Sequence, residues 1–139
     1  MGTTKRRLPV LKSEPEEETR PPWQWVGFGV VMVFTAWVPL AYVGTILSAS
    51  SEATGSPARL VMGTLLPLAT ATAAGGFLVG RFGKPAGVRE ALLAGAVTGL
   101  VAVGLTALSA SFSPLSFAVV VLAALFAGAG GAAGVRLRK

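Results

Sequence analysis

Hydrophobic residues are gathered into four long runs along the chain, and short polar segments separate the runs. The runs cover about residues 23–47, 59–79, 89–108 and 114–135. Each is close to the roughly 20 residues that an α-helix needs to cross a bilayer. They are apolar all round and lack the polar face of a surface helix. The pattern therefore predicts an all-α, polytopic membrane protein, with four transmembrane helices within residues 23–139.

The N-terminal segment differs from the rest of the chain, because residues 1–22 are rich in charge and proline. A segment with so little apolar content cannot bury enough surface to offset the entropy lost on folding. We therefore expect residues 1–22 to form a disordered cytoplasmic tail. The Arg6-Arg7 pair is not expected to be an export signal, because an acidic segment follows it and the apolar run is longer than a signal-peptide core.

With four spans, alternate polar segments lie on opposite sides of the membrane, and basic residues are distributed very unequally between the two sides. Eleven lie in the tail, in the segment between the second and third runs, and at the C-terminus, whereas Arg59 is alone in the other two segments. Because Lys and Arg accumulate on the cytoplasmic side of membrane proteins, we expect both termini to be cytoplasmic and the spans to form two tandem hairpins. The expected location is a cell membrane, namely the bacterial inner membrane. The residues expected to anchor the cytoplasmic side at lipid headgroups are Arg81, Lys84, Arg89, Arg136, Arg138 and Lys139.

A short pattern occurs twice, each time at the end of an apolar run. Gly75-Gly76 precedes Arg81 with the same spacing as Gly130-Gly131 precedes Arg136, at an offset of 55 residues. Tandem duplication of a two-helix unit would produce this match. Convergence would also produce it, because small residues followed by arginine are typical of any glycine-rich helix that ends at the cytoplasm. The sequence leaves both explanations open.

Small residues recur at intervals of four in the last two runs. Lipid provides no hydrophobic drive for helices to associate, so helices pair where small side chains let their backbones approach closely. The residues expected to form such helix contacts are Ala91, Gly95 and Gly99 in the third run and Ala123, Ala127 and Gly131 in the fourth.

Proline interrupts the first two runs, at Pro39 and Pro67. Proline removes one backbone hydrogen bond and clashes with the preceding turn, so a kink is expected at each position. Thr35 and Tyr42 lie on the same helix face as Pro39. This stripe either lines a cavity or supplies hydroxyl groups to the backbone that the proline leaves unpaired.

Several kinds of chemistry are excluded by composition. The chain contains no Cys, His or Asp, so disulfides and the usual zinc or haem ligands are absent, and no cofactor or metal is expected. General acid–base catalysis needs a titratable group near the reaction, and none of the six glutamates lies in the middle of a run. We therefore expect no enzymatic activity. Nucleic-acid binding is not expected either, because no basic stripe is interleaved with aromatic residues.

Two known families are similar to this chain in size and number of spans. Small multidrug carriers rely on a glutamate within the first span, and this chain has none there. The segment from Gly130 to Arg136 resembles a glycine-rich segment ending in Arg that fluoride channels carry, but it lies at the opposite end of this chain. Their Thr/Phe/Ser-rich segment has no counterpart, so neither family's function is expected here.

These observations favour a small integral membrane protein with a structural or accessory role. It would pack against itself or a larger membrane complex and contact membrane lipids. The alternative is a passive channel or carrier for a small neutral or anionic solute, with the prolines as gates. The residues that would line such a path are Thr35, Tyr42, Thr64, Thr70 and Thr98.

Overall fold

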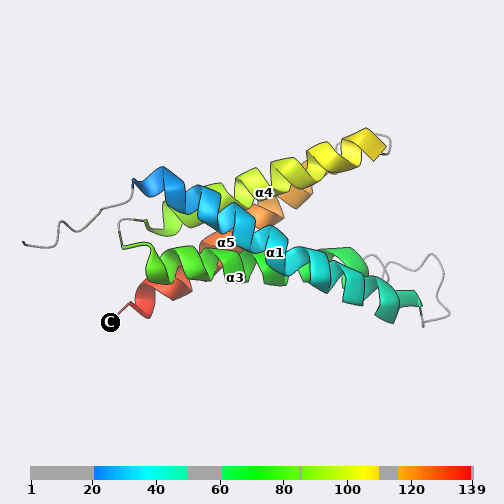
Figure 1. The fold of residues 1–139 in the computed structure, drawn as a ribbon, viewed down its shortest axis with the longest axis horizontal. Coiled ribbons are helices and arrows are strands. Elements are labelled where there is room, and N and C mark those ends of the chain that lie inside the picture. The colour runs from blue at the N-terminus through cyan, green and yellow to red at the C-terminus, as the bar shows by residue number, and fades with distance from the viewer. Residues whose placement is uncertain (1–20, 50–60, 85, 110–115, 139) are drawn as a thin grey trace, which may run out of the picture.

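The computed structural model is all-helical in the part that it describes, which comprises residues 21–49, 61–84, 86–109 and 116–138 (Figure 1). Its elements are α1 (Pro22–Ala49), a π-helical turn η1 (Val61–Leu65), α3 (Leu66–Phe82), α4 (Val88–Ser109) and α5 (Ser116–Arg136). Four helical segments in this part are long and apolar enough to cross a membrane. The predicted all-α architecture with four candidate membrane helices is therefore confirmed.

The first helix is longer than the hydrophobic run predicted. Ser48 and Ala49, expected in the following loop, belong to α1. The Ser48 hydroxyl donates a hydrogen bond to the Gly44 carbonyl at 2.7 Å, and the side chain is buried. A serine whose hydroxyl bonds back into its own helix can continue that helix. The rest of this loop, and residues 1–20 of the tail predicted to be disordered, lie outside the described residues. Pro22, the last residue of the predicted tail, is the first residue of α1.

The ends of the later helices follow local signals in the sequence. Glu90 lies in the first turn of α4, where its carboxylate accepts a hydrogen bond from the Gly87 N–H at 2.6 Å. This is the back-reaching half of a capping box. Pro67 lies in the first turn of α3, directly after the π-helical turn η1, with which α3 is continuous. Because proline lacks an N–H, it leaves one position of this helical ladder without a donor. Pro39 lies within α1, which continues through it. The kinks at the two prolines stay predictions.

The four long helices are packed closely at one end and diverge toward the other (Figure 1). Contacting positions rise together in α3 and α5, so these helices run in the same direction. α4 runs antiparallel to α5, and α1 runs antiparallel to α3. α5 packs mainly against α3 and α4, and α1 lies across the same two helices.

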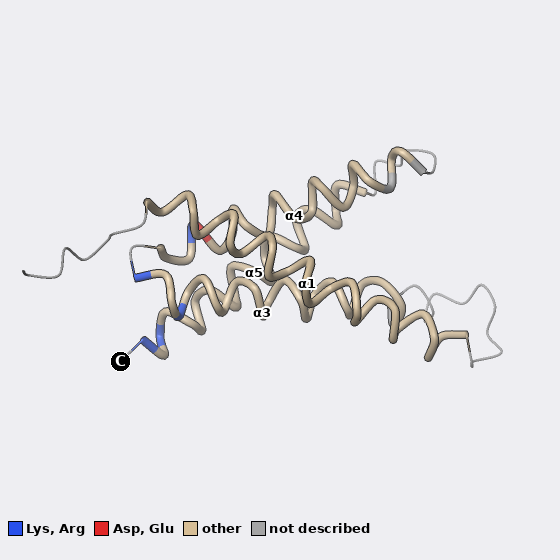
Figure 2. Tube along the Cα trace, in the orientation of Figure 1, with Lys and Arg blue, Asp and Glu red and all other residues tan. Residues whose placement is uncertain are grey.

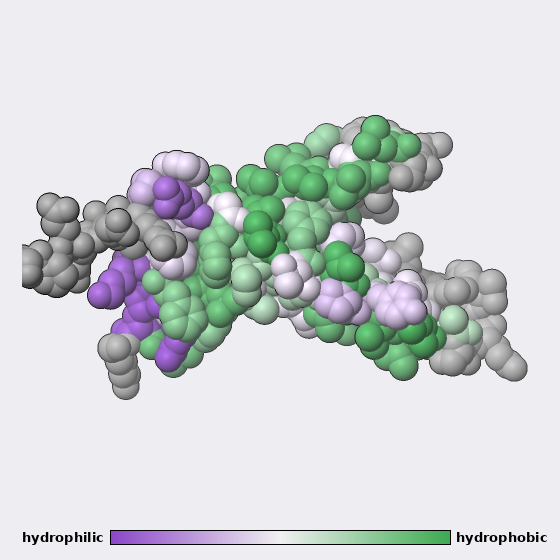
Figure 3. Space-filling model, viewed as in Figure 1, coloured by the Kyte–Doolittle hydropathy of each residue, from purple (hydrophilic) through white to green (hydrophobic). Residues whose placement is uncertain are grey.

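Small residues make up most of the interior. The alanines of the core are at most 2% exposed, and these are Ala71, Ala86, Ala91, Ala94, Ala123 and Ala127. Large residues such as Leu100, Leu125 and Phe117 are instead more than half exposed. Hydrophobic residues cover much of the face shown in Figure 3 between the two ends of the molecule. This arrangement suits a lipid environment, in which backbone approach drives helix packing and large apolar side chains are stable outside.

Candidate functional site

The basic residues that the structure describes gather at the closely packed end of the bundle (Figure 2). They lie at the end of α3, in the α3–α4 connection, at the start of α4 and at the end of α5, and they are Arg81, Lys84, Arg89, Arg136 and Arg138. Five of the six predicted anchors therefore share one end, and Lys139 lies outside the described residues. A cluster of cations at one end of a membrane helix bundle is suited to contact anionic headgroups.

Two of these arginines bind the chain itself. The Arg138 guanidinium donates hydrogen bonds to the carbonyl oxygens of Lys84 at 3.1 Å, Ala86 at 2.6 Å and Gly83. Arg81 donates in return to the Leu137 carbonyl at 3.1 Å. The three acceptors of Arg138 follow the end of α3, and the Gly83 carbonyl also accepts a hydrogen bond from the Ala86 N–H at 2.9 Å. We call this set of hydrogen bonds the arginine clasp; it ties the C-terminal segment to the α3–α4 connection.

An aromatic side chain from the first helix covers the same connection. Trp25 of α1 packs against the buried cluster of Val79, Ala86 and Ala91. Gly83 lies so close that a Cβ added there would be 3.0 Å from the Trp25 ring. The entry of α1, the end of α3 and the start of α4 therefore meet in one small core at the basic end.

Glycine brings the backbones of α3 and α5 into direct contact. A Cβ added to Gly76 would lie 2.7 Å from the carbonyl carbon of Ala127 and closer still to its oxygen. A Cβ added to Gly80, one turn later, would lie 2.9 Å from the Gly131 Cα. Since both neighbours are backbone, neither can move aside alone. We call this contact the glycine seam.

The other side of the glycine seam is formed by glycines of α5. A Cβ added to Gly130 would lie 2.8 Å from the carbonyl carbon of Ala73, and one added to Gly134 would lie 2.8 Å from the Arg81 backbone nitrogen. The contacts across the seam join residues that are 51 positions apart in the chain (Gly76 and Ala127) to 57 positions apart (Ala73 and Gly130). The repeated pattern recurs after 55 positions, which lies within this range. Its two copies therefore pack side by side.

The six predicted packing residues lie where α4 meets α5. A Cβ added to Gly95 would lie 2.5 Å from the Ala123 carbonyl oxygen and 2.6 Å from the Ala127 Cβ. One added to Gly99 would lie 2.7 Å from the Val120 Cα. Gly131 faces Ala91 in the same way, with the added Cβ 2.5 Å from the alanine methyl. All six residues are buried within the single chain.

Polar side chains of the proposed solute path are not gathered in one place. Thr98 is completely buried, and its hydroxyl donates to the Ala94 carbonyl at 2.8 Å. Thr35 and Thr70 are exposed and bond back to carbonyls of their own helices. Tyr42 and Thr64 are also exposed. The hydroxyls that bond to carbonyls one turn earlier satisfy their own helices and leave little polarity for a lining.

Metal-binding side chains do not cluster in the described ranges. Glu90 is the one acidic residue there, and its carboxylate is engaged at the start of α4. No group of three His, Cys, Asp or Glu side chains that could hold a metal occurs among these residues. Nothing in this part of the chain offers the ligand set of a metal centre.

The sequence prediction contains only part of the glycine seam. Gly76 and Gly80 form one GxxxG pattern, and Gly130 and Gly134 form another. None of these four is a predicted packing residue, although the predicted Ala127 and Gly131 are the α5 contacts of Gly76 and Gly80. The arginine clasp has no such signal, because arginine at the end of a span is ordinarily expected to face headgroups.

Comparisons of the chain with models of known protein families, with curated protein sequences and with solved structures find no match. The function therefore has to be inferred from the geometry of the helices, the basic end and the exposed surface.

Proposed function

We propose that this chain is a small integral membrane protein with a structural or accessory role, which associates with itself or with a larger membrane complex. It performs no catalysis of its own in this proposal. Support comes from the absence of Cys, His and Asp and from the engagement of Glu90 in a helix cap. A group held in a cap is poorly placed to exchange protons with a substrate.

The observation that carries the proposal is the unequal burial of the four helices. In the candidate span Gly63–Phe82, half of the apolar 18-residue stretch is buried within the chain. In α1 only 11% of the corresponding stretch is buried. Gly76 and Gly80 of α3 and the six predicted packing residues of α4 and α5 are buried by contacts within the chain. Association with another protein would therefore use the exposed face of α1, where Val31 is 63% and Val38 is 60% exposed.

The proposed orientation has both termini and the basic end in the cytoplasm, with the spans arranged as two tandem hairpins in the bacterial inner membrane. The strong bias of Lys and Arg toward one set of segments supports it. Each basic residue near an anionic surface contributes about 1 kcal/mol of attraction. Arg89 and Arg136 are exposed at this end and are suited to lipid phosphates. Nucleic acid is not a proposed partner.

A passive channel or carrier has less support. Its proposed lining residues divide between the interior and the exposed surface, with Thr98 buried and Tyr42 68% exposed. A solute path needs polar groups that converge on one space. Flux of a small neutral or anionic solute into vesicles containing only the purified chain would nonetheless overturn the accessory role.

Site-directed photo-crosslinking in the native membrane tests the proposed association. A photoreactive residue is placed at Val31 or Val38 on α1, and matched controls are placed at Val121 or Leu125, which are 58% and 59% exposed on α5. Protein adducts are expected from the two α1 positions and not from the α5 positions. Mild-detergent co-purification followed by mass spectrometry then identifies the partner. Equal adduct yields from both helices, or none from α1, would contradict the proposal.

Reporter fusions test the orientation. A fusion at residue 54 should report the outside, and a fusion at the C-terminus should report the cytoplasm, since the positive-inside bias opposes any other arrangement. Signals from the same side at both positions would refute the four-span orientation.

A further inference from the structure

The packing of α3 against α5 changes character along their length. At the basic end, Gly76 and Gly80 bring the two backbones into contact. Toward the other end, the facing positions carry Leu65, Leu68 and Leu122 instead. Side chains of this size hold the helices apart, because they cannot interpenetrate as glycines allow. The sequence therefore builds a wedge-shaped space beyond the glycine seam.

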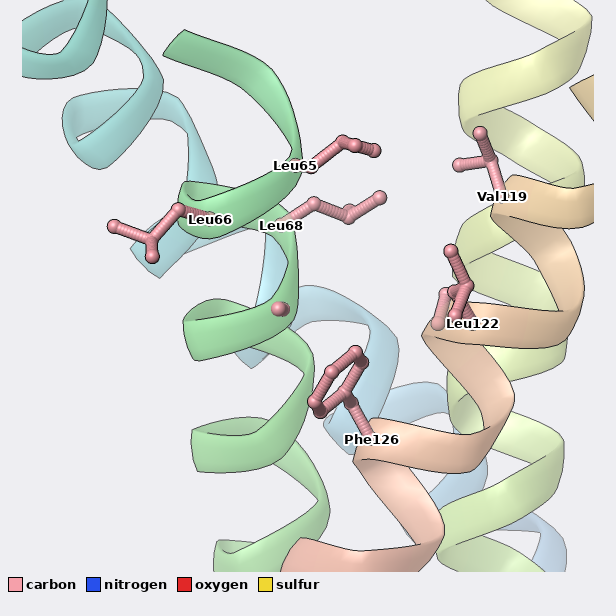
Figure 4. A pocket seen from close by; sticks show the side chains of 8 residues that line it. Leu65, Leu66, Leu68, Val119, Leu122 and Phe126 are labelled. Atoms are coloured by element: carbon pink, nitrogen blue, oxygen red, sulfur yellow. The ribbon is translucent and has the colours of Figure 1, made fainter. Parts of the chain in front are cut away.

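This space is an apolar groove with a volume of about 320 Å³. Leu65, Leu68 and Ala69 line one wall, and Val119 and Leu122 line the other (Figure 4). Leu65 and Leu68 extend across the space toward Val119 and Leu122 (Figure 4). The α3 wall is well packed at Leu68, which is only 4% exposed.

The end of the groove nearest the glycine seam is closed by an aromatic ring. Phe126 projects between α3 and α5 (Figure 4), and the next residue, Ala127, is the seam contact of Gly76. Leu66 lies at the rim and is 54% exposed. The lining residues are all apolar, so the groove offers side-chain hydrogen bonds to no ligand. An occupant must therefore be a hydrocarbon.

Distances along the helices place the groove within one half of the membrane. At 1.5 Å per residue, Phe126 lies about 15 Å and Val119 about 26 Å from the level of Arg136. Ala69 lies about 18 Å from the level of Arg81 by the same measure. The hydrocarbon core of a bilayer is about 30 Å thick. The groove thus begins near the middle of the bilayer and extends toward the face opposite the basic end.

We propose that this groove is a binding site for one acyl chain of a phospholipid in the leaflet opposite the basic end. The methyl end of the chain lies against Phe126, and the headgroup lies beyond Val119. The groove matches the depth of one leaflet, has no polar lining, and opens sideways to the surrounding lipid. The inference rests on the membrane-spanning arrangement of the proposed function. With the proposed orientation, in which the basic end is cytoplasmic, the leaflet opposite it is the outer leaflet.

A transmembrane helix of a partner protein fits this groove less well. Close helix pairing in lipid needs small residues at the contact, whereas Leu65, Leu122 and Phe126 line this groove. A flexible single chain avoids this difficulty.

Photoactivatable lipid tests the site in the full chain. The purified protein is placed in phosphatidylcholine–phosphatidylglycerol vesicles that contain a phospholipid with a diazirine midway along one acyl chain, and adducts are mapped by peptide mass spectrometry. Leu122 and Phe126 line the groove and are 42% and 43% exposed, whereas the neighbouring Val121 and Leu125 at the same depth do not line it and are 58% and 59% exposed. The yield at the groove pair should be at least about threefold higher, which corresponds to about 0.65 kcal/mol.

A groove-filling variant provides the matched control. Ala69→Trp places a large ring in the groove and should reduce the adducts at Leu122 and Phe126 to the level of the outer face. Ala118→Trp adds the same ring at an exposed position of α5 that does not line the groove. It should leave the enrichment unchanged. The wild-type comparison remains a test if Ala69→Trp does not fold.

Three results would overturn the inference. The first is equal adduct yield on both faces of α5 in the wild-type chain. The second is unchanged enrichment in a folded Ala69→Trp protein. The third is disulfide-linked dimer formed by Leu122→Cys under oxidation, which would show a second copy in the groove; the chain has no other cysteine. Protein crosslinking from α1 is a separate experiment. A negative lipid result therefore leaves the accessory role unaffected, and a negative crosslinking result from α1 leaves the acyl-chain site unaffected.

Discussion

Alanine at Gly76 is expected to force α3 and α5 apart. Its Cβ would lie 2.7 Å from the carbonyl carbon of Ala127, whereas ordinary contacts of a Cβ begin at 3.4 Å. The helices must therefore separate locally by at least about 0.7 Å, and the clash with the Ala127 oxygen demands more. Overpacking of this kind typically costs about 1–3 kcal/mol.

The same substitution at Gly104 separates this cost from the effect of helix propensity. Gly104 lies within α4, and a Cβ there meets nothing within 4 Å. Replacing a helical glycine with alanine stabilises the helix by about 0.8–1.0 kcal/mol in water. This gain is common to both variants, so the difference in unfolding free energy between Gly76→Ala and Gly104→Ala should be about 1–3 kcal/mol.

Unfolding by increasing fractions of sodium dodecyl sulfate in mixed micelles, followed by circular dichroism, measures that difference. Gly80→Ala should behave like Gly76→Ala, because its Cβ would meet the Gly131 backbone. The double variant should cost less than the two single variants added together, since one separation of the helices relieves both clashes. Equal effects of Gly76→Ala and Gly104→Ala on stability would refute the glycine seam.

Substitutions test three further contacts. Arg138→Ala should lower the unfolding free energy by about 1–3 kcal/mol, as expected for hydrogen bonds from a charged group, and should speed amide exchange in the α3–α4 connection. The control Arg136→Ala, at an exposed position, should change the unfolding free energy by less than about 0.5 kcal/mol. Equal effects of the two variants would contradict the arginine clasp. Glu90→Ala should cost about 0.3–1 kcal/mol, because α4 loses a negative charge at its N-terminus, and Glu90→Gln should retain the capping hydrogen bond; hydrogen exchange in the first turn of α4 reports both. Gly95→Leu combined with Gly99→Leu should destabilise the isolated chain in the same detergent titration, because both glycines face the α5 backbone, and a folded, unperturbed double variant would show that this contact is wrong.

Local chemistry along the chain predicted much of this architecture. Four runs of apolar residues became four candidate membrane helices, because hydropathy over some 20 residues decides whether a helix can remain in lipid. Glu90 lies in the first turn of α4, where its carboxylate accepts a hydrogen bond from the Gly87 N–H, a contact between residues only three positions apart. The boundary at Ser48 was missed because a serine-rich segment is typical of a loop, while its hydroxyl can also bond within a helix.

The choice of helix partners was decided by the tertiary structure. Gly76–Gly80, Gly95–Gly99 and Gly130–Gly134 are equivalent patterns in the sequence, and each can support a close helix contact. Which of these patterns contact one another depends on how all the helices pack together. This is a non-local property, and the spacing of glycines along the chain does not specify it. The same packing brings Arg138 to the carbonyls after α3, 52–55 residues away in the chain. It also opens the groove beside Phe126, since glycine closes one end of the α3–α5 contact and bulky leucines hold the other end apart. The sequence by itself determined which segments can span a membrane and which ends carry charge; the mutual packing of the spans decided which surfaces are buried and which remain available to lipid or a partner.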